Sequence, residues 1–174
     1  GLAGVSFGNF LIKQVVEELK AELPNIRTFV TLSPVPGFAT WLAAQRKDPG
    51  SALDADQRAA LALLDDAGWH QDADKAEALR APLLAAAARY FLQSRDAKGR
   101  VPDPVARFHL GNGARLERLN HLGDLSPNGL KQSHGLMVNY LYDLDRIEAN
   151  HEAFAERGIV AAASQVHRAM PAPN

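Results

Sequence analysis

The chain has 174 residues and a formal net charge of −1, so it lacks the overall basic charge expected of proteins that bind nucleic acids or anionic membranes. It contains no cysteine, which excludes disulfide bonds and thiolate metal sites. Every apolar run is far shorter than the ~20 residues needed to cross a bilayer. We therefore expect a cytoplasmic domain with no nucleic-acid or membrane partner.

The N-terminal part predicts a glycine-containing loop, a helix and a strand. An amphipathic pattern predicts a helix from about residue 10 to 22, with Asn9 as its N-cap. Residues 27–33 are rich in β-branched and apolar side chains and are followed by Pro34, which predicts a strand. A glycine turn before a helix offers free backbone N–H groups to phosphate. No Gly-Lys-Ser/Thr sequence follows, so an anion site and an ordinary loop both remain open.

Two further parts of the chain predict helices. Residues 40–100 are rich in alanine, leucine, aspartate and glutamine, with helices predicted at 55–68 and 74–94. Candidate N-cap residues for these two helices are Asp54 or Asp56 and Asp72 or Asp74. Residues 144–157 and 159–169 predict two terminal helices separated by a glycine.

The remaining segment predicts a short helix and a strand pair. Pro102 and Pro104 begin a short helix that ends at His109. Residues 114–124 and 135–143 are predicted to pair as strands across a polar loop.

Two polar residues stand where a catalytic group could be held. Ser33 ends a predicted strand and is followed by a stiff Pro-Val-Pro-Gly turn, which would fix its hydroxyl or simply end the strand. His109 ends an apolar helix before the turn Gly111–Gly113, so it is either a positioned acid or base or a buried core residue. No His-x-x-x-His pair exists in the sequence, and we expect no metal site.

Four long motifs carry a family resemblance: "GVSFGNFLIKQVVEEL", "TLSPVPGF", "PVARFHLGNGARLERLNHLGD" and "SHGLMVNYLYDLDRIEANHEAF". Together they resemble the C-terminal catalytic domain of the malonyl-CoA decarboxylase family. The resemblance implies an α+β, three-layer fold like that of acyl-CoA N-acetyltransferases, with a mixed sheet and a helical insertion. It also implies that residues 1–174 are a partial catalytic domain of a longer chain. Its expected parts are a CoA loop, helix and strand (1–38), a helical insertion (40–100), the histidine helix and hairpin (101–143), and terminal helices (144–170).

The resemblance also assigns site residues. Ser33, His109 and Tyr142 match the family's catalytic serine, catalytic histidine and active-site tyrosine. The expected CoA-binding residues are Gly4, Val5, Ser6, Phe7, Gly8 and Asn9. The acetyltransferase loop pattern is poorly kept, since only its last glycine survives, at Gly8. CoA binding therefore rests on the likeness to the family rather than on this pattern.

The implied reaction is the conversion of malonyl-CoA to acetyl-CoA and CO2 through a thioester enolate. The thioester carbonyl accepts the electron pair, so no cofactor beyond the CoA of the substrate is expected. A fixed hydroxyl and a fixed imidazole can stabilise the oxyanion and deliver a proton. The sequence does not decide which of Ser33 and His109 protonates the carbon and which holds the carboxylate. We favour Ser33 as the carboxylate or oxyanion donor and His109 as the proton donor. The alternatives are an acetyl-CoA-dependent acyltransferase and a non-catalytic CoA-binding or assembly domain.

These interpretations predict a geometry. Ser33, His109 and Tyr142 should line one cleft, whereas Tyr140 should point to the opposite face. The expected partners are malonyl-CoA, the N-terminal remainder of the same protein and further copies in a homo-oligomer. Without that remainder, several apolar side chains should be exposed, namely Phe10, Leu11, Phe29 and Val30.

Overall fold

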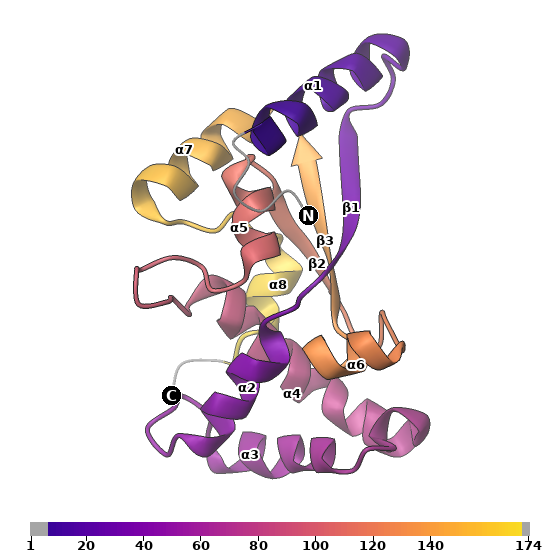
Figure 1. The fold of residues 1–174 in the computed structure, drawn as a ribbon, viewed down its shortest axis with the longest axis vertical. Coiled ribbons are helices and arrows are strands. Elements are labelled where there is room, and N and C mark those ends of the chain that lie inside the picture. Colours follow the sequence, from indigo (N-terminus) through magenta and orange to yellow (C-terminus); the bar gives the residue numbers. More distant parts are fainter. Residues whose placement is uncertain (1–6, 172–174) are drawn as a thin grey trace.

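The protein has a mixed α+β architecture around a small sheet (Figure 1). The computed structural model describes residues 7–171, with the backbone alone for residues 7–11 and 13. Its three strands are β1 (Thr28–Pro34), β2 (Arg115–Asn120) and β3 (Met137–Asp143). They form an antiparallel sheet of order β1-β3-β2, so the last strand in sequence lies in the middle.

Helices lie along one side of this sheet and beyond its ends (Figure 1). They are α1 (Phe7–Glu22), α2 (Phe38–Lys47), α3 (Ala55–Leu61), α4 (Ala73–Leu92), α5 (Pro104–Gly111), α6 (Pro127–Ser133), α7 (Ile147–Arg157) and α8 (Ser164–Ala169), with 3-10 turns at η1 (Ala62–Asp65) and η2 (Trp69–Gln71). Helices α5 and α8 contact β2, and α7 contacts α5. Helices α2, α3, α4 and α6 form the helical part in the lower half of Figure 1.

One face of the sheet is buried against the helices. Side chains alternate along β1, so Phe29, Thr31 and Ser33 turn inward. Their cross-strand partners on β3 are Tyr142, Tyr140 and Val138, all buried. This shared face continues into the main hydrophobic core, to which α2 and α4 contribute Phe38, Leu42, Leu79, Leu83 and Phe91. Ser33 and Thr31 thus place two hydroxyl groups on a largely apolar face.

Most of the predicted elements are confirmed. Strand β1 lies within one residue of the predicted range 27–33, and the two predicted hairpin strands pair as β2 and β3. Asp54 caps α3, where a capping box with Gln57 completes the start of the helix. Asp72 caps α4 by accepting hydrogen bonds from two backbone N–H groups. The predicted helix 55–68 is shorter, since it passes into a 3-10 turn that ends at Asp65.

Three local predictions are wrong, and one helix was not predicted. Helix α1 begins at Phe7, so Asn9 lies within its first turn instead of capping it. Helix α2 was not predicted as a separate helix, because it follows a Pro-Gly turn and has no side-chain cap. The polar loop between β2 and β3 contains α6, capped by Ser126. Residues 159–163 are not helical, because they run beside β2 in a parallel bridge between Leu116 and Ala162.

The outer face of β1 is unusually apolar for an exposed surface. Val30 is 56% exposed, as predicted, and Leu32 is 61% exposed. Phe29 was expected to be exposed as well, but it points to the inner face and packs on the core. The side chains of Phe10 and Leu11 lie outside the described residues. Since β1 is also an edge strand, both its outer face and its edge are left open by the described residues.

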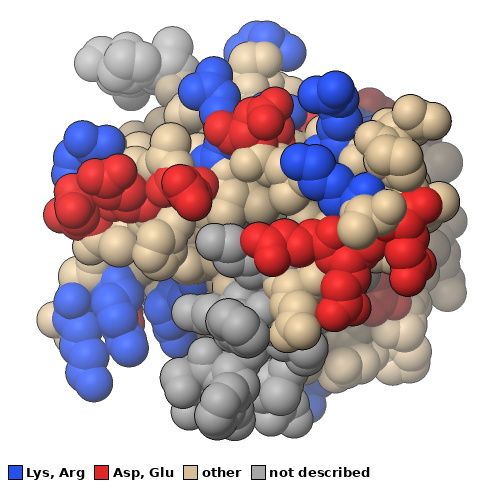
Figure 2. Space-filling view, turned by 90° about the horizontal axis from the view of Figure 1, so that it is seen from above, with Lys and Arg blue, Asp and Glu red and all other residues tan. Residues whose placement is uncertain are grey.

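The surface charge is mixed. On the face seen in Figure 2, small groups of acidic and basic side chains lie beside one another. None of the described helices is long and apolar enough to cross a membrane.

Candidate active site

Three elements bring Ser33, His109 and Tyr142 together. Ser33 lies near the end of β1, His109 in the last turn of α5, and Tyr142 near the end of β3. The Ser33 Oγ atom is 3.4 Å from His109 Nε2, and His109 Nδ1 is 2.6 Å from the Tyr142 hydroxyl. All three side chains are buried. The predicted contact of Ser33 and His109, with Tyr142 beside them, is confirmed, while the cleft that they were expected to line stays a prediction.

The start of α5 fixes the direction of the helix that carries His109. Asp103 is the N-cap, and its Oδ1 atom accepts hydrogen bonds of 2.9 Å from the N–H groups of Val105 and Ala106. Pro104 occupies the first helical position, where its missing N–H is not needed. His109 follows six residues after this cap. Asp103 was not predicted as a functional residue, although an aspartate directly before a proline is a helix-start signal.

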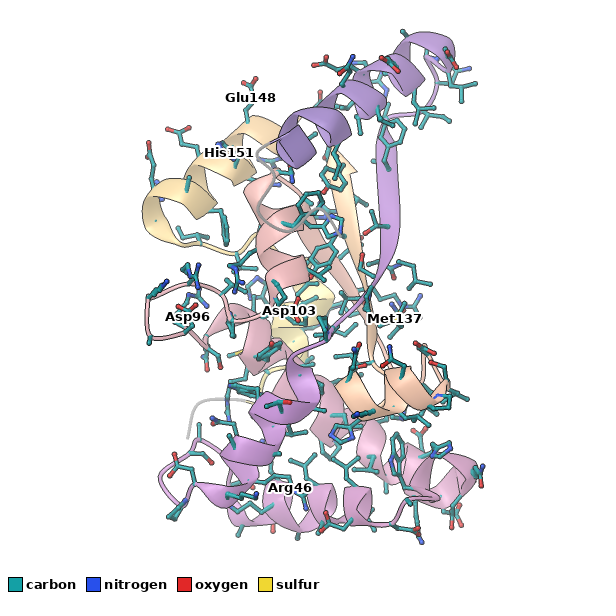
Figure 3. The ribbon with its side chains drawn as sticks, in the orientation of Figure 1. Arg46, Asp96, Asp103, Met137, Glu148 and His151 are labelled. Carbon is teal, nitrogen blue, oxygen red and sulfur yellow. The ribbon has the colours of Figure 1, made fainter. Side chains whose placement is uncertain are left out.

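The glycine turn after His109 is a packing site for α7. Gly113 has a φ of +86°, and a Cβ atom there would overlap the backbone carbonyl of Ile147. Asn150 donates a hydrogen bond of 3.1 Å to the Gly113 carbonyl, and His151 Nδ1 lies 2.7 Å from the Gly111 carbonyl (Figure 3). The space beside Gly113 is therefore filled by the start of α7. Around Gly111 the described residues leave open space.

Burial keeps the site electrically neutral. It lowers the pKa of His109 to about 4, so the imidazole is uncharged at pH 7. Burial also raises the pKa of the Tyr142 hydroxyl well above its usual range, so this group keeps its proton. The Tyr142 hydroxyl can therefore donate to Nδ1 of the neutral ring or accept from Nδ1–H.

Two further residues contact the site. The Thr31 hydroxyl lies 3.0 Å from Ser33 Oγ. The spacing of two residues in the strand segment "TLS" places both hydroxyls on one face, so this pairing was predictable from the sequence. Tyr140 stacks on His109, with ring centroids 4.4 Å apart and an interplanar angle of 19°.

The prediction that Tyr140 points away from the site is wrong. Only a bulge between Tyr140 and Tyr142 would turn their side chains to opposite faces, and β3 pairs with β1 without any register shift from Met137 to Asp143. The irregularity lies in β2 instead, between Leu116 and Arg118. Two residues apart on a regular strand, both tyrosines face the same side.

The expected CoA-binding segment is described only in part. Gly4, Val5 and Ser6 lie outside the described residues. The other three expected residues, Phe7, Gly8 and Asn9, form the first turn of α1 instead of a loop. Within the described part of the chain, no group of three or more metal-ligating side chains is placed to hold a metal ion.

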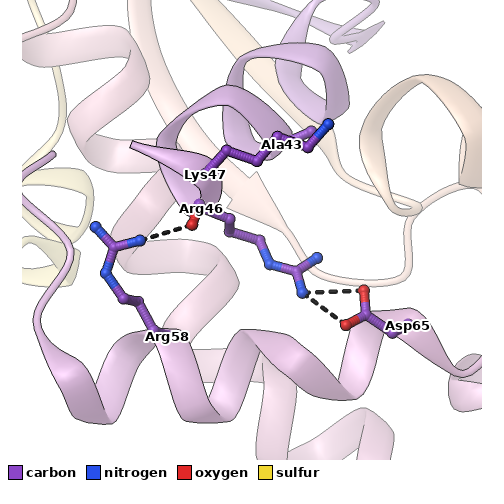
Figure 4. Close-up of a pocket in the computed structure, with 5 residues that line it drawn as sticks. All are labelled: Ala43, Arg46, Lys47, Arg58 and Asp65. Carbon is purple, nitrogen blue, oxygen red and sulfur yellow. Dashed lines mark hydrogen bonds and ion pairs between the residues drawn. The ribbon is translucent and has the colours of Figure 1, made fainter. Parts of the chain in front are cut away.

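A cavity of about 290 Å3 lies elsewhere, between α2 and the region around α3 (Figure 4). Its lining includes neither Ser33 nor His109. The Arg46 guanidinium is paired with Asp65 at 2.9 Å, and the Arg58 guanidinium donates to the Arg46 and Asp48 carbonyls. Because these cations already have partners, we assign them a role in joining the two helices.

Comparison with known proteins identifies the family. The model of the malonyl-CoA decarboxylase C-terminal domain matches residues 1–174. This chain belongs to the malonyl-CoA decarboxylase family. It is 37% identical to the mitochondrial malonyl-CoA decarboxylase of Anser anser anser and 36% identical to that of Rattus norvegicus, in each case over 95% of the chain. It covers 36% and 37% of those proteins, so it spans just over a third of these curated relatives.

Solved structures of the family have the same fold. The malonyl-CoA decarboxylase of Rhodopseudomonas palustris is 66% identical and superposes with a TM-score of 0.92 over 98% of this chain and 39% of that chain. The enzyme of Agrobacterium vitis is 57% identical, with a TM-score of 0.92 over 98% of this chain and 42% of that chain. The fold of this family member therefore matches that of its solved relatives over almost its whole length.

Proposed function

We propose that the protein of which this chain forms part decarboxylates malonyl-CoA to acetyl-CoA and CO2, acting as a carboxy-lyase. The observation that carries the proposal is the contact of Ser33, His109 and Tyr142 on a buried sheet face. Membership of the malonyl-CoA decarboxylase family supports this reaction and this substrate.

The reaction breaks the bond between the carboxylate carbon and the methylene carbon of the malonyl group. The electron pair of this bond moves into the thioester carbonyl and produces an enolate, and CO2 leaves. A proton then adds to the methylene carbon and restores the thioester. Because the thioester accepts the electrons itself, the protein has to exclude water, stabilise the enolate oxygen and supply one proton.

The neutral His109 fits the role of proton donor once the substrate is bound. A malonyl carboxylate close to the ring would favour the imidazolium and raise the low pKa of His109. The imidazolium would then donate Nδ1–H to the Tyr142 hydroxyl and offer Nε2–H toward Ser33 and the substrate carbon. The Ser33 hydroxyl would donate to the carboxylate or the enolate oxygen. One such donor is typically worth about 10²–10³ in rate.

We further propose how the rest of the protein completes this domain. The open face and edge of β1, with Val30 and Leu32 exposed, suit additional strands of an acetyltransferase-like mixed sheet from the N-terminal remainder. The first turn of α1 is the proposed CoA phosphate site, because a helix start favours anions. Assembly into a homo-oligomer and a cytoplasmic location complete the proposal; the vertebrate relatives are named mitochondrial.

The test uses the intact full-length protein with malonyl-CoA. We expect acetyl-CoA and CO2 to form in equal amounts, and the rate to fall in a Ser33→Ala variant. Transfer of an acetyl group from acetyl-CoA to an amine, without CO2 release from malonyl-CoA, would support an acyltransferase instead. Binding of malonyl-CoA by the folded protein without any turnover would support a non-catalytic domain.

A further inference from the structure

Asp103 is a fully buried acidic residue that does more than cap a helix. Its Oδ1 atom accepts both hydrogen bonds of the α5 N-cap. Its Oδ2 atom is equally buried, and no described residue makes a full hydrogen bond to it. A helix cap needs only one oxygen, and serine serves about as well as aspartate. Burying a second, charged oxygen is costly, so it calls for a separate explanation.

The surroundings of Oδ2 belong to the segment that follows Ser33. A Cβ atom added at Gly37 would lie 2.6 Å from the Tyr90 hydroxyl and 3.9 Å from Asp103 Oδ2. Gly37 ends the turn that leaves β1 four residues after Ser33, and it begins α2. Glycine, the Tyr90 hydroxyl and the carboxylate therefore meet in a space that has no room for a side chain at position 37.

The pKa shifts of Asp103 and Tyr90 support a contact among Asp103, Gly37 and Tyr90. Burial raises the pKa of Asp103, while the backbone N–H groups of Ala106, Gly37 and Val105 act in the opposite direction. Burial and the nearby Asp103 carboxylate together raise the pKa of the Tyr90 hydroxyl. Gly37 and Tyr90 are thus the groups outside α5 that interact with this carboxylate most directly.

We propose that Asp103 is a positioning residue that, through Gly37 and Tyr90, joins the start of the His109 helix to the turn after Ser33. The need for such a link follows from the 3.4 Å between Ser33 Oγ and His109 Nε2, which is at the long end of hydrogen bonding. The two residues come from segments 76 positions apart in sequence. A small relative shift of β1 and α5 would separate them. This inference rests on the proposed function.

The test distinguishes the proposed positioning role of Asp103 from its role as the N-cap of α5. Asp103→Ser keeps the cap and removes Oδ2. Asp103→Asn keeps the cap and the volume, but puts an uncharged NH2 group in place of Oδ2. Tyr90→Phe removes the hydroxyl near Gly37 and keeps the aromatic ring. That ring packs against Phe38, Trp41 and Phe91, so the substitution leaves the aromatic contacts of His109 unchanged. The matched control is Asp72→Ser, because Asp72 caps α4 with the same pattern of two backbone hydrogen bonds.

In the full-length enzyme, we expect each of the three test variants to lower kcat by roughly tenfold to a hundredfold, with KM changed by less than about threefold. Asp72→Ser should keep the parental kcat. The ring ¹⁵N shifts of His109, assigned by their loss in His109→Asn, should change in both Asp103 variants and stay unchanged in Asp72→Ser. If Asp103→Ser does not fold, Asp103→Asn and Tyr90→Phe carry the same test.

Parental kcat and parental His109 shifts in Asp103→Asn and Tyr90→Phe would overturn the inference and leave Asp103 as a helix cap. Failure of the parental enzyme to release CO2 would instead overturn the proposed function. In that case the His109 shifts would still decide whether Asp103 positions the ring.

Discussion

The imidazole of His109 lies almost parallel to the ring of Tyr140, while its Nδ1 atom contacts the hydroxyl of Tyr142. The stack holds the plane of the imidazole, and the hydrogen bond holds its rotation within that plane. Nε2 is left directed at Ser33. Two side chains from one strand therefore orient the ring that we propose as proton donor.

Removing either member of the proposed catalytic pair should lower turnover. We expect Ser33→Ala and His109→Asn each to reduce kcat for malonyl-CoA at least about tenfold, with the protein still folded. Steady-state release of acetyl-CoA and circular dichroism of the full-length variants measure both properties. His121→Asn is the control, since His121 is a half-buried histidine that contacts the Ala76 carbonyl away from the site. Parental rates in both site variants would show that the site assignment is wrong.

Tyr142→Phe should lower kcat by roughly tenfold, because it removes the partner of Nδ1 and frees the ring to rotate. Tyr140→Phe should have a smaller effect, since it keeps the stacked ring and removes a buried hydroxyl that has no hydrogen bond from the described residues. Kinetics of both variants under the same conditions test this order. A larger loss in Tyr140→Phe would contradict it.

The stability of the protein should fall in mild acid. His109 has a folded pKa of about 4, below its ordinary value of 6.5, so the unfolded chain binds more protons between these two pH values. The free energy of unfolding should therefore decrease as the pH falls from 6.5 to 4, by at most about 3 kcal/mol from this residue. His134, whose pKa burial also lowers to about 4, should add to the effect.

Urea unfolding of the full-length protein at several pH values measures this dependence. In His109→Gln the slope between pH 6.5 and 4 should be shallower than in the parental protein. An equal slope in both proteins would mean that His109 is not held neutral by burial.

The two glycines that flank Asn112 should respond differently to alanine. Gly113→Ala forces a side chain into a left-handed backbone conformation and against the Ile147 carbonyl, so we expect a loss of at least about 2 kcal/mol. Gly111 lies in the last turn of α5, and there is open space where an alanine side chain would be. Gly111→Ala should therefore be neutral or slightly stabilising. Thermal unfolding of both variants compares them directly. Equal effects would exclude the packing role that we assign to Gly113.

Residues 1–174 expressed alone should not unfold cooperatively or bind malonyl-CoA tightly. Val30 and Leu32 remain exposed in this chain, and covering one such side chain is worth about 1.5–3 kcal/mol. Calorimetry of residues 1–174 measures the transition. A sharp two-state transition of a monomer, with tight binding of malonyl-CoA, would contradict the expected dependence on the N-terminal remainder.

The sequence predicted elements where a local signal was strong. Asp54 and Asp72 were among the residues that indicated the starts of α3 and α4, and the β-branched run before Pro34 indicated β1. Helices α2 and α6 were missed because their short segments follow or contain turn residues, and tertiary packing stabilises them.

Local sequence marked Ser33 and His109 as separate candidates, but only the family resemblance joined them with Tyr142 into one site. No local pattern relates Ser33 to a histidine 76 residues later, since only the fold brings them together. The position of Tyr140 depended on where a bulge falls, and the sequence does not show that β2 rather than β3 has the irregularity. The burial that neutralises His109 is likewise a property of the assembled core.

The strand order β1-β3-β2 sets the order in which this region can form during synthesis. The central strand leaves the ribosome last, so β1 and β2 emerge with no pairing partner between them. More than a hundred residues separate Thr31 from Asn139, whose side-chain amide donates to the Thr31 carbonyl. Such distant contacts close slowly. A nascent chain that stops before Met137 therefore presents two open strand edges and is a natural substrate for chaperones.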